Sequence, residues 1–523
     1  MVTFIIIFLA FVTFLCIYLH KLCTKKPKNF PPGPPSLPIW GGYWFLLLAN
    51  YNFTHKAIDV LAKQYKSNIV GLLAGDFPVI LVTGYNLVKE ALIRDEFIGR
   101  PDVYVTRYRS LGDLLGNFFI GITFTDGNHW KEQRRFSLRQ LRDYGFGRRF
   151  ASTEVLFEGD VKALIEYLNA NPNPNDNDIH CKKGRVLIPD LFYGALSNAI
   201  LHMLVGKRFE DKEMRELARS TLRFLRNVDA TGRAISITPW IRHLAPEYFG
   251  SKPLHIENTR MRDFFLELVE ERQKNFSDDH HGDFLDTFLS TIQQLQREGI
   301  DLGKKQLIWI LADYLIPSPN VVGPALNMLW AHLCKYPDVQ VKIQEEIDRV
   351  VGRSRLPNLD DRKNMPYTEA VLRESLRMDP VVPINIPRRC LEDTTLGGYS
   401  IPKVKRFFLV FLLQHALQDT LVLISLWSAN YDSQVWDDPE QFRPERFLDD
   451  NGNLLKKYYT VSFGGGKRLC VGETFSRNNM FLMLSGLLQN FNFKAVGEVP
   501  NLENKKWGLI CDIPAFWVDA ISR

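Results

Sequence analysis

Residues 463–473 read Phe-Gly-Gly-Gly-Lys-Arg-Leu-Cys-Val-Gly-Glu within a chain of 523 residues. The strand-like Tyr459-Thr-Val-Ser precedes this segment, and an apolar run at 475–488 predicts a helix after it. Glycine allows the backbone to approach another group closely. A helix that begins near Gly472 would direct its amide hydrogens toward Cys470. The segment therefore predicts a cysteine that is held for use as a thiolate.

Other functions of such a segment have further requirements. A glycine-rich phosphate loop needs Ser or Thr after its lysine, but Arg468 follows Lys467. A nucleophilic cysteine needs a histidine partner, and no such signature accompanies Cys470. A plain structural loop stays open for any short glycine-rich stretch. A thiolate bound to a haem iron would use every feature, because the glycines allow close approach and Arg468 can pair with the propionates.

Three other segments carry charged or aromatic residues at fixed spacings. Glu374-Ser-Leu-Arg377 places both charges on one helix face, although surface ion pairs at that spacing are common. The others are Pro444-Glu-Arg-Phe447 and Trp130-Lys-Glu-Gln-Arg134. With the pattern Phe-x-x-Gly-x-Arg-x-Cys-x-Gly, they resemble in content and order the ExxR, PERF, WxxxR and haem-binding motifs of the cytochromes P450. The resemblance runs from about Pro31 to the C-terminus and is nearest to animal microsomal members, such as arthropod proteins related to vertebrate drug and steroid hydroxylases.

This resemblance implies a mixed α/β, mostly helical cytochrome P450 fold around haem b, iron protoporphyrin IX. It implies a monooxygenase that oxidises a lipophilic small molecule with O2 and electrons from NADPH-cytochrome P450 reductase, with cytochrome b5 as a second candidate partner. Cys470 would be the axial thiolate, and Arg446 would join the Glu374–Arg377 pair in a buried charge network. The residues that would hold or frame the haem are Trp130, Arg134, Arg388, Phe463, Gly466, Arg468, Cys470 and Gly472.

The composition, 46% hydrophobic and 24% charged, is that of a globular protein. A net charge of +6 is weak evidence for nucleic acid, so we expect no nucleic-acid partner. The seven cysteines form no CxxC pair, which argues against a zinc ribbon and suits a reducing compartment. One group of basic residues could meet an acidic reductase or form a solvated face, namely Lys131, Arg134, Arg135, Arg139, Arg142 and Lys467.

The N-terminus carries a targeting signal. Residues 1–19 contain no charged side chain, and four lysines follow by position 28. This apolar length can span a bilayer, and the lysines favour a cytoplasmic location for the rest of the chain. A cleaved signal peptide would have a shorter apolar region with its positive charge in front. We predict a transmembrane anchor at 1–20, a basic, proline-rich hinge at 21–36 and a catalytic domain at 37–523 that faces the cytoplasm from the endoplasmic reticulum membrane.

The periodicity of the remaining chain predicts strands within residues 68–84 and mostly helices from about 128 to 380. Within the helical part, Pro337 is typical of a helix start. By analogy with the family, the substrate pocket would draw on residues 103–125, 225–245, 313–322, 381–386 and 508–510. Most of these side chains are apolar, which favours a lipophilic ligand and is also typical of an ordinary core.

The sequence departs from the family pattern at residues 317–322, which read Pro-Ser-Pro-Asn-Val-Val. Family members usually carry an acid and a threonine in place of Asn320 and Val321, and that pair relays protons to oxygen. Prolines at 317, 319 and 324 remove helix hydrogen bonds, so the helix should kink or open here. We expect non-standard oxygen activation, with Ser318, Asn320, a water or a substrate hydroxyl as the candidate relay. The alternatives are an isomerase or dehydratase that acts on a (hydro)peroxide without external electrons, and a catalytically inactive haem-binding protein.

A second departure is the insertion at residues 404–418, VKRFFLVFLLQHALQ. It separates Gly397–Lys403, which resembles a strand turn of the family, from the strand-like Asp419–Trp427. The apolar part is too short to span a bilayer. We favour a retained intron translated in frame, because valine codons begin with GT and a glutamine codon can end in AG. An amphipathic excursion is the alternative, and the sequence of the transcript decides between them.

Overall fold

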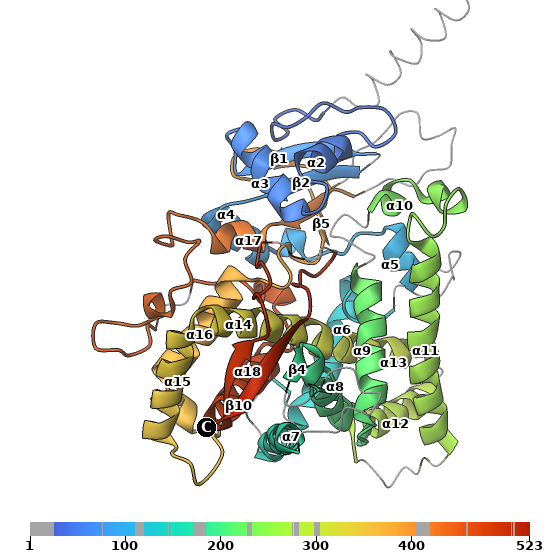
Figure 1. Ribbon diagram of the computed structural model, residues 1–523. Helices are drawn as coiled ribbons and strands as arrows, with labels where there is room; N and C mark the ends of the chain where they lie inside the picture. The colour runs from blue at the N-terminus through green and yellow to red at the C-terminus, as the bar shows by residue number, and fades with distance from the viewer. Residues whose placement is uncertain are drawn as a thin grey trace, which may run out of the picture.

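The computed structural model describes residues 26–523 apart from 76, 110–119, 145, 148, 150, 171–180, 183–184, 227–232, 275, 277–281, 298–303, 404–418, 457–458, 504 and 506–507. Within these limits the protein is mostly helical, with one sheet at each end (Figure 1). The helices up to residue 274 are α2 (Tyr43–Ala49), α3 (Thr54–Gln64), α4 (Tyr85–Ile93), α5 (Tyr104–Arg109), α6 (Gly127–Asp143), α7 (Ala151–Asn169), α8 (Asp190–Val205), α9 (Asp211–Arg226), α10 (Arg233–Ile237) and α11 (Ser251–Lys274). Those that follow are α12 (Phe284–Arg297), α13 (Lys304–Leu315), α14 (Gly323–Lys335), α15 (Pro337–Val350), α16 (Pro366–Met378), α17 (Leu426–Asn430) and α18 (Glu473–Asn490).

The strands predicted within residues 68–84 are confirmed. β1 (Ile69–Ala74) and β2 (Phe77–Val82) pair antiparallel, and β2 pairs in parallel with β8 (Leu421–Ile424), which adjoins β5 (Arg388–Arg389). Every residue of β1, β2 and β8 is buried, as continuous apolar runs predict. A second four-stranded sheet contains, in order, β3 (Cys181–Lys182), β4 (Arg185–Ile188), β10 (Phe516–Ser522) and β9 (Phe491–Ala495). A two-stranded sheet contains β6 (Thr394–Leu396) and β7 (Tyr399–Ile401).

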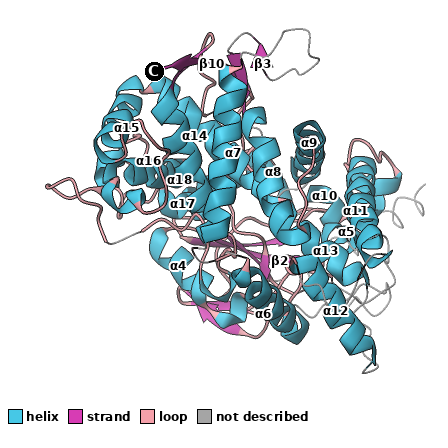
Figure 2. Ribbon diagram, turned by 90° about the horizontal axis from the view of Figure 1, so that it is seen from below, coloured by secondary structure: helices cyan, strands magenta, loops and turns pink. Residues whose placement is uncertain are grey.

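The helical core is largely apolar. In α14, Leu326, Leu329 and Trp330 are fully buried, as expected for a mostly apolar helix at the centre of a protein. The Phe192 ring of α8 lies edge-on to Trp330 with 4.9 Å between the ring centroids. Figure 2 shows α7, α8, α14 and α18 lying alongside one another. Because α18 follows Cys470 directly, this core determines where the cysteine lies.

The helix that contains the prolines opens as predicted. α13 ends at Leu315 and α14 begins at Gly323, and between them Ser318–Val322 forms a π-helix. Proline at 317 and 319 supplies no amide hydrogen, so two bonds of the regular ladder are missing. π-helical turns widen a helix and occur frequently at functional sites. The widened turn therefore makes residues 318–322 a candidate part of the functional site.

The insertion predicted at 404–418 lies outside the described residues, but its flanks are close together. The Thr420 amide donates to the Lys403 carbonyl at 2.8 Å, and the Thr420 hydroxyl donates to the Pro402 carbonyl at 2.5 Å. If Lys403 were joined directly to Asp419, the first of these bonds would close a three-residue γ-turn. The flanks can therefore be connected without the intervening fifteen residues.

Deletion of residues 404–418 should leave the fold intact. Since β7 and β8 already lie where a direct connection needs them, we expect the shortened protein to bind haem and to melt within a few degrees of the full chain. Thermal unfolding and haem content measure this. A control deletion of residues 421–424 removes β8 and should abolish folding, and an equal loss in both variants would contradict the inference.

The predicted anchor at 1–20 also lies outside the described residues. In the part of the chain that the structure does describe, no helix has both the length and the apolar character needed to cross a bilayer.

Candidate functional site

The cysteine loop, residues 463–472, leads into α18. Its two ends are close together, because the Cys470 amide donates to the Phe463 carbonyl at 3.0 Å. Gly472 precedes the first residue of α18, Glu473, which confirms the helix start predicted from the sequence. Cys470 thus lies at a helix N-terminus, where the helix dipole favours negative charge on the sulfur.

Two glycines of the cysteine loop are required by its backbone. Gly464 and Gly466 have φ angles of 76° and 64°, in the left-handed region that other residues rarely adopt. A Cβ atom on Gly466 would lie 2.6 Å from the Leu92 carbonyl oxygen and 2.8 Å from the Ile93 Cα. The loop therefore packs backbone against backbone on the end of α4.

Cys470 is accessible to solvent and yet set within the fold. Its side chain is exposed, but burial raises the pKa of the thiol. The backbone amide of Gly472 and the charge of Arg134 act in the opposite direction and lower this pKa. The helix N-terminus and Arg134 therefore favour the thiolate against the effect of burial.

Trp130 and Arg468 stack beside the cysteine loop. The guanidinium carbon of Arg468 lies 3.6 Å from the Trp130 ring centroid. Arg468 also donates to the carbonyl of Ile98 at 2.8 Å and to that of Thr125 at 2.6 Å. The Trp130 indole N–H is buried and makes no hydrogen bond. A buried donor of this kind points to an acceptor supplied by a ligand.

Two more predicted arginines lie at the same place. Arg134, one turn after Trp130 in α6, donates to the Leu469 carbonyl at 2.6 Å, and Arg388 donates to the Leu92 carbonyl at 2.9 Å. Burial lowers the pKa of Arg388 to about 10 and that of Arg468 to about 9. Because a guanidinium stays protonated in proteins, these shifts mark buried positive charge with too little compensation.

Arg100 belongs to this cluster and was missed by the sequence analysis. It is buried and donates to three backbone carbonyls. Burial, followed by the charges of Arg468, Arg388 and Arg134, lowers its pKa well below the usual value. Its signal in the sequence was a lone arginine between Gly99 and Pro101, which lies in none of the motifs used.

These residues fit a haem. Three buried guanidiniums, the half-buried one of Arg134 and one unpartnered indole N–H suit the two propionates, which are carboxylates. Among the described residues, no group of three His, Cys, Asp or Glu could hold a bare metal ion. A metal at Cys470 would therefore have to bring further ligands with it, as the porphyrin nitrogens of haem do.

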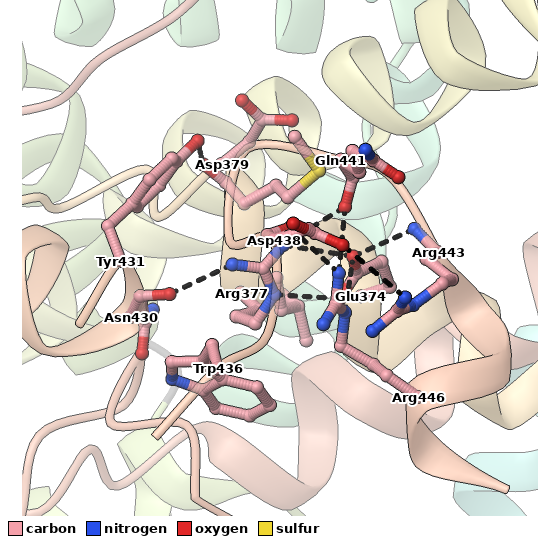
Figure 3. Close-up of polar contacts among 12 residues, drawn as sticks. Glu374, Arg377, Asp379, Asn430, Tyr431, Trp436, Asp438, Gln441, Arg443 and Arg446 are labelled. Carbon is pink, nitrogen blue, oxygen red and sulfur yellow. Dashed lines mark hydrogen bonds and ion pairs between the residues drawn. The ribbon is translucent and has the colours of Figure 1, made fainter. Parts of the chain in front are cut away.

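The motif charges Glu374 and Arg377 form a buried ion pair on α16 (Figure 3). Both side chains are fully buried, and Arg377 Nε lies 2.7 Å from Glu374 Oε2. The other carboxylate oxygen accepts from Arg446 Nε at 3.0 Å and from the Arg443 amide at 2.9 Å. The predicted three-residue charge network is therefore present, and its charges are not those of an ordinary surface pair.

This network extends to the residue before the cysteine loop. Arg377 donates to the Asn430 carbonyl at 2.9 Å, and the Asn430 side chain donates to the Ser462 hydroxyl at 3.0 Å. Ser462 in turn donates to the Leu376 carbonyl at 2.7 Å. Because Ser462 precedes Phe463, the buried charges on α16 fix the start of the cysteine loop.

The π-helix directs its polar side chains away from its accessible face. Ser318 donates to the Leu196 carbonyl of α8 at 2.8 Å, and Asn320 donates to the Thr221 hydroxyl of α9 at 2.5 Å. Both are buried, whereas Pro317 is exposed and Val321 half-buried. Val321 therefore lies on the accessible face, and Ser318 and Asn320 face neighbouring helices.

Comparison with known proteins identifies the class to which this fold and site belong. The family model described as "Cytochrome P450" matches residues 31–518. Farnesoate epoxidase of Bombyx mori is 32% identical over 94% of both chains. Cytochrome P450 2F2 of Mus musculus is 32% identical over 91% of this chain and 90% of its own, and probable cytochrome P450 305a1 of Drosophila melanogaster is 30% identical over 91% of both.

The chain belongs to the cytochrome P450 family. It is accordingly an oxidoreductase of the monooxygenase type, and haem is its cofactor. The resemblance inferred from the sequence motifs is thereby confirmed.

Replacing Trp130 by phenylalanine should weaken haem retention. Phenylalanine keeps an aromatic face under Arg468 but removes the unpartnered N–H. A hydrogen bond to a charged group contributes about 1.5–3 kcal/mol, so haem should dissociate about ten-fold faster or more. Transfer of haem to excess apomyoglobin measures the rate. Trp240→Phe, at a 55% exposed site, is the control, and equal rates in the two variants would contradict the assignment.

Proposed function

We propose that this protein is a haem-thiolate monooxygenase of a lipophilic small molecule, with Cys470 as the axial iron ligand. The observation that carries the proposal is the position of Cys470 at the N-terminus of α18, beside a cluster of arginines, Arg100, Arg134, Arg388 and Arg468, that form no ion pair with the described residues. Bound haem supplies the activation of dioxygen, and a thiolate ligand favours O–O cleavage.

The residues around the sulfur would have two different roles, binding the propionates and fixing the cysteine loop. Arg100, Arg134, Arg388, Arg468 and the Trp130 N–H would hold the propionates. Phe463, Gly466 and Gly472 would frame the sulfur, because they fix the loop backbone. The charge network of Glu374 would hold the start of this loop through Asn430 and Ser462.

The proton route on the other side of the haem would differ from the usual one. Val321, on the accessible face, can neither donate nor accept a proton. A relay through Ser318 would require its hydroxyl to leave the Leu196 carbonyl. We therefore favour a water or a hydroxyl of the substrate as the proton source.

The presence of Asn320 and Val321 in place of the family's usual acid and threonine also supports a second candidate function, an isomerase or dehydratase that acts on a hydroperoxide. Two assays separate the functions: turnover with NADPH and reductase, and turnover of a lipid hydroperoxide without either. Product in the first assay supports the monooxygenase, and product in the second alone rejects it. Bound haem with no product in either would indicate a catalytically inactive haem-binding protein. Because one relative is a farnesoate epoxidase, a terpenoid carboxylate is the first substrate to try.

The redox partners would be NADPH-cytochrome P450 reductase and, as a second donor, cytochrome b5. Lys131, Arg135, Arg139 and Arg142 are exposed on α6, at spacings that give one helix face. Arg134 turns inward to the haem site, and Lys467 pairs with Asp95. The docking face is therefore the four exposed cations of α6.

Charge reversal on this face should slow electron delivery. For Arg135→Glu combined with Arg139→Glu we expect about a ten-fold lower rate of reductase-supported reduction at low salt, because complementary charge mainly governs association. Salt should reduce this difference by screening. Ligand affinity should not change. Lys162→Glu, on the exposed face of α7, is the control. An unaltered reduction rate in the double variant would contradict the assignment of this docking face.

The membrane assignments are part of the same proposal: an anchor at 1–20, a hinge at 21–36 and a catalytic domain from 37 on that faces the cytoplasm at the endoplasmic reticulum. Two segments at one end of the molecule, residues 37–51 and 238–248, support a membrane contact (Figure 1). The Trp40 indole joins them by donating to the Thr238 hydroxyl at 2.6 Å. Their exposed apolar residues are Leu37, Ile39, Leu48, Tyr51, Trp240, Leu244 and Tyr248. A protein that lacks residues 1–36 should still bind neutral phosphatidylcholine vesicles, and failure to bind would contradict this surface.

A further inference from the structure

Helix α9 is attached by polar contacts to the π-helix and to residues 508–512. The first contact is the bond from Asn320 to Thr221. The second is the Leu509 amide, which donates to the Leu225 carbonyl at 3.0 Å. The third is the ion pair between Arg226 and Asp512, with an N–O distance of 3.0 Å. All three lie on the last turns of α9.

The Asn320 contact has a defined direction. Its amide nitrogen lies 2.9 Å from the Ile316 carbonyl, which can only accept, so the NH2 group must be on this side. The Thr221 hydroxyl donates to the carbonyls of Leu217 and Ala218 in its own helix. Its oxygen is therefore the acceptor for Asn320. Both amide hydrogens of Asn320 are thus used, and neither is directed at the accessible face.

A carboxylate at position 320 could not make these contacts. It has no hydrogen to donate, and it would face the Ile316 carbonyl and the Thr221 oxygen. Asparagine, in contrast, reinforces the weakened π-helix from within and bonds it to α9. The asparagine is therefore matched to a structural contact that an acid would break.

The Asp512 contact is equally specific. Asn327 of α14 donates to its Oδ1 at 2.7 Å, while Arg226 holds Oδ2. Asp512 and Asn327 are almost fully buried. A Cβ atom on Gly508 would lie 2.7 Å from the Arg226 Cα, so the loop backbone rests directly on the end of α9.

We propose that Asn320 is a positioning residue that, with Asp512, clamps α9 against the π-helix and residues 508–512, and that it is not a proton relay. The proposal rests on the proposed function in taking the three segments that these contacts join, the end of α9, the π-helix and residues 508–510, as walls of the substrate pocket, as the family resemblance implies. Ligands then enter and leave when the clamp opens, so its strength sets the rates of ligand exchange.

The test compares Asn320→Asp, Thr221→Val and their combination with the wild-type holoenzyme. Stopped-flow binding and release of 4-phenylimidazole, followed by the haem spectrum, gives the exchange rates, and hydrogen–deuterium exchange reports the amides of α9 and Leu509. The clamp predicts association and dissociation about ten-fold faster in each single variant, since each removes a buried hydrogen bond. The double variant should match the single ones, because all remove the same contact. Thr221→Ser should restore wild-type rates, and Thr291→Val, whose hydroxyl donates to the Thr287 carbonyl within α12, is the control.

A relay makes the opposite predictions. Asn320→Asp would then restore the acid found in other family members and raise the fraction of electrons that reach product, while Thr221→Val would change nothing. Wild-type exchange rates and α9 protection in Thr221→Val would overturn the clamp. Because hydrogen–deuterium exchange of α9 needs no turnover, this result stays separate from any failure of the monooxygenase assay.

Discussion

Serine in place of Cys470 should abolish reductase-supported product formation, by at least about 1,000-fold, which corresponds to about 4 kcal/mol of activation barrier. Serine has nearly the same size and keeps the helix N-terminus, so the cysteine loop should retain its shape. It cannot supply a thiolate, and the electron donation that favours O–O cleavage is lost. Product formation per haem, with haem quantified as its pyridine complex, measures the effect.

The buried arginines make this prediction specific. Because they would hold the propionates independently of the sulfur, part of the haem should remain bound in Cys470→Ser. Cys334→Ser, at a half-buried cysteine near β9, is the matched control and should keep its activity. Substantial turnover per haem in Cys470→Ser would mean that another residue ligates the iron.

Methionine in place of Arg377 should remove most of the folded protein. Arg377 and Glu374 are both fully buried, and removal of one partner leaves an uncompensated charge at a cost of about 3–5 kcal/mol. The total stability of a domain is only about 5–15 kcal/mol. We expect a melting temperature lower by roughly 10 °C, at about 2–4 °C per kcal/mol for large domains, and a low yield of holoprotein.

The control for this prediction is a surface pair at a similar spacing. Lys162 and Glu158 lie 2.9 Å apart on α7 and are 59% and 43% exposed, so Lys162→Met should cost no more than about 1 kcal/mol. A melting temperature for Arg377→Met within two degrees of Lys162→Met would show that the network is not needed for stability.

Local sequence patterns were sufficient to predict some of the strands and helix starts. Continuous apolar runs predicted β1 and β2, and Pro337 predicted the start of α15. The glycines of the cysteine loop predicted a close approach of the backbone to another group, and a Cβ atom on Gly466 would lie 2.6 Å from the Leu92 carbonyl oxygen. These signals are local, so the sequence was sufficient.

The rest depends on contacts between distant segments. Arg100 joins the arginine cluster through partners more than 200 residues away, such as Ile386. Spacing alone could not show that Glu374 and Arg377 are buried. The sequence suggested Ser318 and Asn320 as candidate relays from their place in the family pattern, and it could not show that their side chains contact α8 and α9.

The most direct measurement is the reduced, carbon-monoxide difference spectrum of the purified full-length protein beside Cys470→Ser at equal haem content. We predict the red-shifted band of a thiolate-ligated haem in the wild type and its complete absence in the variant. The same band in both proteins would contradict the account.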